Sequence, residues 1–66
     1  MYHREEIHLA VTLAWKNEER KPRQETQYFC ENIVGGDAQG AYDAAAAQRD
    51  RWIANMQEQH PGAREI

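Results

Sequence analysis

Bulky apolar side chains are scarce in this chain of 66 residues, and this scarcity limits the core that it can build. Ten of its 27 apolar or aromatic residues are alanine, which leaves 17 larger apolar side chains. A chain this short cannot hold two domains or an enzyme scaffold with a deep cleft. Apolar residues at 41% beside charged residues at 29% are nevertheless typical of a globular protein. We therefore expect one domain over residues 1–66, with a thin core.

The charge balance argues against a nucleic-acid partner. Eleven acidic residues against eight basic ones give a net charge of −3. Proteins that bind nucleic acids usually carry a basic stripe that displaces counterions from the phosphates. An acidic chain is better suited to a protein partner.

The single cysteine and the short apolar run predict a cytoplasmic protein without a membrane segment. Cys30 has no second cysteine with which to form an intramolecular disulfide, as is usual in a reducing compartment. The apolar stretch Ile7–Trp15 is far shorter than the roughly 20 residues that a membrane-spanning helix needs.

The spacing of apolar residues predicts a first helix over residues 4–20. Ile7, Ala10, Val11 and Ala14 follow the i, i+3, i+4, i+7 rule of a helix face. Pro22 disfavours helical geometry at the residue before it, which ends the element.

The next segment, residues 22–34, is predicted to be a second helix. Thr26, Phe29, Cys30 and Ile33 repeat the helical spacing, and Gly35 follows as a helix stop. A strand over Tyr28–Val34 is the competing interpretation, because that run is rich in aromatic and β-branched residues.

A third and longest helix is predicted over residues 38–59. Asp37 is a suitable N-cap, and the alanines of Ala44–Ala47 are the strongest helix formers. Pro61 and Gly62 end the helix, and residues 60–66 are expected to form a loose C-terminal tail. The predicted fold is an all-α bundle of three helices joined by short connections.

The thin core leads us to expect a partner, and two apolar surfaces are candidates for the contact. The first is a flank of the first predicted helix, and the second is one end of the third helix. Alternatively, the first helix contacts both other helices and uses this surface internally. Arg49, on the apolar face of the third helix, must reach solvent, pair with a carboxylate such as that of Glu31, or serve recognition. The candidate interface residues are Tyr2, Leu9, Leu13, Arg49, Trp52, Ile53 and Met56.

No arrangement of residues predicts catalysis, a cofactor or a metal site. No nucleophile, base and orienting group stand at a recognisable spacing, and no glycine-rich phosphate loop is present. His3 and His8 are five residues apart, so on a helix they would not face one ion, and His60 follows the last helix. We expect a protein that is not an enzyme and has no small-molecule substrate.

A DNA-binding regulator is the alternative function. Residues 22–34 and 38–59, joined through Gly35, would form a helix-turn-helix. Glu31 stands where such motifs usually carry a small residue, and Asp43 would repel phosphates from the recognition helix. The basic residues available for this alternative are Lys16, Arg20, Lys21 and Arg23.

In size, acidity, its lone Cys30 and its predicted helical pattern, the chain resembles the small all-helical accessory proteins of temperate phages. The resemblance is one of type and assigns no functional residue. It implies action by occluding or modifying a host protein, and for some such proteins DNA binding. We therefore expect a small regulatory or accessory protein that acts by protein–protein contact, as a homodimer, on a host protein, or both.

Overall fold

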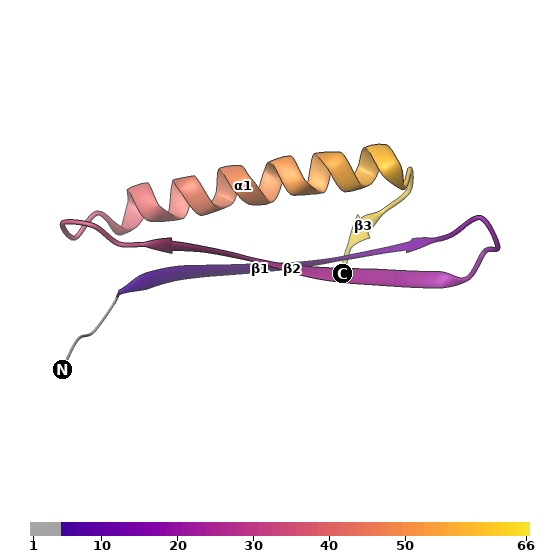
Figure 1. Cartoon of the computed structure of the whole chain (residues 1–66), viewed down its shortest axis with the longest axis horizontal. Coiled ribbons are helices and arrows are strands. Elements are labelled where there is room, and N and C mark those ends of the chain that lie inside the picture. Colours follow the sequence, from indigo (N-terminus) through magenta and orange to yellow (C-terminus); the bar gives the residue numbers. More distant parts are fainter. Residues whose placement is uncertain (1–4) are drawn as a thin grey trace.

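The computed structural model describes residues 5–66 and shows an α+β fold (Figure 1). Strand β1 (Glu6–Lys16) and strand β2 (Pro22–Asn32) form a long hairpin, which helix α1 (Ala38–Gln59) and the short strand β3 (Arg64–Glu65) follow. The strands form one antiparallel sheet in the order β2-β1-β3. The prediction of an all-α bundle of three helices is therefore wrong. Tyr2 and His3 lie outside the described residues.

The first predicted helix, residues 4–20, is replaced by strand β1. Its large apolar side chains occupy every second position, which places them all on one face of a strand. We call this the inner face, because it is the face that α1 covers; the other is the outer face. The residues of β1 on the inner face are Ile7, Leu9, Val11, Leu13 and Trp15.

The second predicted helix, residues 22–34, is also wrong. Strand β2 pairs with β1 along its whole length, from Glu6 opposite Asn32 to Lys16 opposite Pro22, without a bulge. The competing strand interpretation was closer, although the strand begins earlier than Tyr28 and ends before Val34. Since no helix precedes α1 among the described residues, a helix-turn-helix is not formed.

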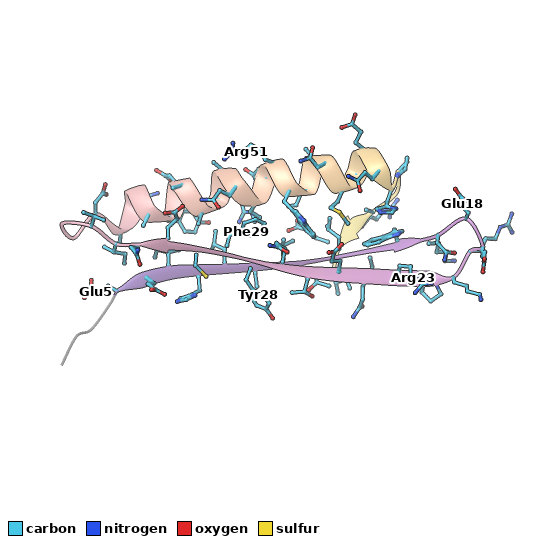
Figure 2. All side chains as sticks on the ribbon, in the orientation of Figure 1. Glu5, Glu18, Arg23, Tyr28, Phe29 and Arg51 are labelled. Atoms are coloured by element: carbon cyan, nitrogen blue, oxygen red, sulfur yellow. The ribbon has the colours of Figure 1, made fainter. Side chains whose placement is uncertain are left out.

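The third predicted helix is confirmed, because α1 spans Ala38–Gln59 and Asp37 caps it. The helix runs along the hairpin and covers the inner face only (Figure 1). In Figure 2, Phe29 of β2 points towards the helix and Tyr28 points away from it. Phe29 is accordingly buried, whereas Tyr28 is 68% exposed.

The core lies between β1, Phe29 and α1. Leu13 is completely buried at its centre, and Met56 packs against the same cluster from the helix. Ala63 is also buried there, and the two residues after it pair with Leu13 and Ala14 as strand β3. The segment predicted as a loose tail therefore contributes to both the core and the sheet. The buried core consists of Val11, Leu13, Phe29, Ala45, Met56 and Ala63.

The molecule is elongated, with principal extents of 50 × 22 × 14 Å. Its radius of gyration is 15.0 Å, whereas a compact domain of this length would have about 11 Å. The tip of the hairpin projects beyond the end of α1 (Figure 1). Among the described residues, no helix combines the length and apolar character required to cross a membrane.

Candidate functional site

The free edge of β2 is the most extensive unpaired backbone surface that the structure describes. β1 lies between β2 and β3, so one side of β2 has no neighbouring strand among residues 5–66. β2 is 11 residues long, about twice the usual length of a strand. Its only proline, Pro22, is its first residue, so no proline interrupts the edge.

The hydrogen bonds at both ends of the hairpin show which backbone groups of β2 face this edge. Ile33 N donates to Glu5 O at 2.9 Å, and Asn17 N donates to Lys21 O at 3.0 Å. In an antiparallel pair, the bonded and non-bonded residue pairs alternate along the strand. The odd-numbered residues of β2 therefore bond to β1, and the even-numbered residues from Pro22 to Asn32 direct their backbone groups outward.

Proteins usually protect such edges, because unpaired N–H and C=O groups readily pair with another strand. Charged side chains, prolines, bulges and short strands are the usual forms of protection. β2 has neither a bulge nor an internal proline, and its charged residues, Arg23, Glu25 and Glu31, all stand at positions whose backbone groups bond to β1. Its outward-directed residues between the two ends are Gln24, Thr26, Tyr28 and Cys30, all uncharged and exposed.

The structure separates the residues predicted for an interface into a buried pair and a half-buried group. Leu13 and Met56 lie in the core of the single chain and are not available to a partner on its surface. Leu9, Arg49, Trp52 and Ile53 are half-buried. Trp52 packs edge-on against Phe29 of β2, with ring centroids 6.2 Å apart.

Arg49 pairs with its chain neighbour. Its guanidinium lies 3.2 Å from Asp50 Oδ1. Hydrogen bonding to Asp50, and to a smaller extent to Tyr42, raises the pKa of Arg49 above its usual value. Glu31, the carboxylate considered from the sequence, instead accepts a hydrogen bond from the side-chain amide of Gln48.

The hairpin end carries a basic groove that the sequence did not predict. The groove has a volume of about 840 Å³. Lys16, Arg23 and Arg64 contribute three cations to its lining, and none of the lining residues within 5–66 is a carboxylate. Trp15 forms part of the wall and stacks on His60, with ring centroids 4.3 Å apart. Lys16 and Arg23 were predicted for nucleic-acid contact and now share this groove, while Arg20 and Lys21 lie in and beside the turn.

At the opposite end of the hairpin, the register brings together three chemically active side chains. His8 and Cys30 are opposite each other on the outer face, and His8 Nδ1 lies 3.1 Å from Cys30 Sγ. The other ring nitrogen of His8, Nε2, lies 3.2 Å from Glu6 Oε2. Activated cysteines have the same arrangement: the thiol lies beside an imidazole, and a carboxylate orients the imidazole. Cys30 lies on the open face of the sheet and is exposed.

Sequence reasoning missed this trio, because His8 and Cys30 are 22 residues apart and only the strand register joins them. Within residues 5–66, no three His, Cys, Asp or Glu side chains form a possible metal site. Comparison with protein-family models, curated proteins and solved structures finds no match to the chain.

Proposed function

We propose that the chain is a small non-enzymatic regulatory or accessory protein that acts in the cytoplasm by protein–protein contact, as a homodimer. The observation that carries the proposal is the free edge of β2, an 11-residue strand whose even-numbered residues direct unpaired backbone groups outward. Pairing an exposed strand with a strand of another chain is an established mode of protein recognition. Action on a host protein, as in the phage accessory proteins that the chain resembles, belongs to the same proposal.

The shape of the molecule supports this proposal independently. A radius of gyration of 15.0 Å indicates a surface larger than a compact chain of this size would have. Small domains bury a smaller fraction of their surface than large ones do, so their stability is marginal. Association along the edge would add hydrogen bonds and buried area that the single chain lacks.

Light scattering and sedimentation equilibrium test the homodimer. We expect a particle of twice 7.7 kDa at micromolar concentration. The double variant Thr26→Lys/Tyr28→Lys places charges on the exposed edge strand, where lysine protects natural edges, and should be monomeric. Ala10→Lys is the matched control, since it adds a charge to the outer face of β1 and should leave the dimer intact.

A strict monomer at every concentration would overturn the homodimer. A dimer that Ala10→Lys disrupts and the double variant leaves intact would place the contact on the outer face of the sheet. It would thereby contradict the role of the β2 edge.

A second candidate function, nucleic-acid contact, is favoured by the basic groove. The groove combines Lys16, Arg23 and Arg64 with the aromatic Trp15, and such combinations occur in proteins that bind single strands. Binding of a labelled single-stranded or duplex oligonucleotide should then weaken steeply as salt rises. Arg64→Gln should reduce this binding, and Arg51→Gln, on α1, should not. No binding at low salt would exclude this function.

A further inference from the structure

We infer that β2 pairs with β2 of a second copy about a two-fold axis at Gln27, which forms one continuous sheet of six strands. This inference rests on the proposed homodimer and specifies its surface and its register. Two features of β2 carry it, its outward backbone groups and the charges of Arg23 and Glu31, and the chain exposes enough surface for the contact.

The outward backbone groups of β2 are self-complementary in this register. Residues 22–32 are symmetric about Gln27, so an antiparallel copy in full overlap places Thr26 opposite Tyr28 of the partner. It also places Gln24 opposite Cys30. These are all even-numbered residues, whose N–H and C=O groups face the edge, so each facing pair can exchange two hydrogen bonds. Gln27 then meets its own copy as a non-bonded pair at the axis.

Two of the three charges of β2 are complementary in the same register, and the third, Glu25, faces Phe29 of the partner. Full overlap places Arg23 opposite Glu31 of the partner, twice by symmetry. Within residues 5–66, neither of these two side chains forms an ion pair. Glu31 is half-buried, and its known partner is the neutral amide of Gln48, so its carboxylate gains from a cation. Opposite charges in facing positions stabilise antiparallel pairs, whereas like charges destabilise them.

The surface that the chain exposes is large enough for such a dimer. The solvent-accessible surface of the chain is 5430 Å², whereas that of a compact protein of 7.7 kDa is about 4,300 Å². A stable interface covers about 800 Å² on each partner, which is less than this difference. A two-fold axis also closes the assembly, because each copy uses its free β2 edge and no second β2 edge remains.

Disulfide trapping tests the register. Gln24→Cys should form a covalent dimer with the native Cys30 of the partner, since bonded pairs hold their Cα atoms about 5.5 Å apart, within the range for disulfides. Gln24→Cys/Cys30→Ser is the matched control and should stay uncrosslinked. The wild type should also stay uncrosslinked, because the two Cys30 residues would be about 20 Å apart, six residues along the strand.

A second variant tests the axis directly. Gln27→Cys/Cys30→Ser should crosslink to its own copy, since non-bonded pairs hold their Cα atoms about 4.5 Å apart. Each variant is oxidised with a mild disulfide oxidant and analysed on a non-reducing gel, and light scattering is recorded under reducing conditions. Gln24 and Gln27 are both exposed, so these substitutions should not disturb the core.

The outcomes separate the two proposals. Crosslinking of both variants but not of the controls supports the register. A dimer in solution in which neither variant crosslinks, or in which wild-type Cys30 does, overturns the register and leaves the homodimer. A monomer in solution overturns both.

Discussion

The carboxylate of Asp37 occupies the space into which a side chain at Gly40 would project. Asp37 Oδ1 accepts a hydrogen bond from Gly40 N at 2.9 Å, which caps the first turn of α1. A Cβ atom added to Gly40 would lie 2.2 Å from Asp37 Oδ2, much closer than atoms can approach. The cap and the glycine are therefore a coupled pair.

This coupling predicts that Gly40→Ala has different effects on stability in two backgrounds. Alanine normally stabilises a helix by about 1 kcal/mol relative to glycine, but Gly40→Ala would displace a cap worth a similar amount. We expect Gly40→Ala to be neutral or destabilising in the wild type, and stabilising by about 1 kcal/mol in an Asp37→Ala background. Urea unfolding of the four proteins measures the coupling. Equal effects of Gly40→Ala in both backgrounds would show that the pair is independent.

Leu13 should be the most costly residue to truncate, because its side chain is completely buried between the sheet and α1. Leu13→Ala should lower the free energy of unfolding by about 2–5 kcal/mol, through lost burial and the cavity left behind. Ile66→Ala, at a side chain that is 79% exposed, should change it by less than about 0.5 kcal/mol. Denaturation at one fixed protein concentration measures both. A loss below about 1 kcal/mol for Leu13→Ala would contradict the described core.

The hairpin turn contains a strained residue that a substitution can relieve. Arg20 has a φ of 62°, the left-handed conformation. It is the last residue of the three-residue loop 18–20 that the hydrogen bond from Asn17 N to Lys21 O closes, a position where natural hairpins favour glycine. Asn17 completes the turn, since its side-chain oxygen accepts hydrogen bonds from the backbone of Glu19 and Lys21, both at 2.9 Å.

Arg20→Gly should therefore stabilise the protein by about 0.5–1 kcal/mol, because glycine adopts this conformation without a steric penalty. Glu18→Gly is the control, because the φ of Glu18 is not positive. Glycine at this position only adds conformational freedom to the unfolded chain and should therefore destabilise the protein. Thermal unfolding measures both changes. Destabilisation by Arg20→Gly would show that the Arg20 side chain contributes more than its backbone strain costs.

The helix α1 could be predicted from the sequence because its signals are local. Asp37 at the start, the alanines in the middle and Pro61 after the end all act within a few residues of the helix. β1 was mistaken for a helix because Ile7, Ala10, Val11 and Ala14 also fit a helical face. Two of those four are alanines, which a strand accepts on its open face. The five bulky side chains at alternate positions, from Ile7 to Trp15, are the stronger signal and indicate a strand.

β2 could not be predicted with the same ease, because most of it carries no core pattern. Phe29 is its one buried residue, and its other side chains lack an alternation of apolar and polar groups. It is a strand because β1 supplies a long row of hydrogen-bonding partners, which is a tertiary effect. The basic groove and the Glu6–His8–Cys30 trio depend on the same register and were hidden for the same reason.

The Glu6–His8–Cys30 trio predicts a cysteine that reacts faster than an ordinary surface thiol. His8 Nδ1 lies 3.1 Å from Cys30 Sγ, where it can accept the thiol proton when the ring proton is on Nε2, and Glu6 Oε2 lies 3.2 Å from Nε2 on the other side of the ring. The thiolate is the form that attacks an alkylating reagent. His8→Phe should therefore slow the alkylation of Cys30 by iodoacetamide roughly tenfold at neutral pH, and Glu6→Gln should slow it less.

His60→Ala is the control for this measurement, since His60 stacks on Trp15 at the other end of the hairpin and should leave the rate unchanged. Mass spectrometry follows the alkylation of Cys30 over time, without interference from other thiols because the chain has one cysteine. Substituting His8 also leaves the backbone of β2 intact, so the dimer should persist and the rate should report on proton transfer alone. If His8→Phe and the wild type react at the same rate, the imidazole does not activate the thiol. The contact between them then only fills the outer face of the sheet.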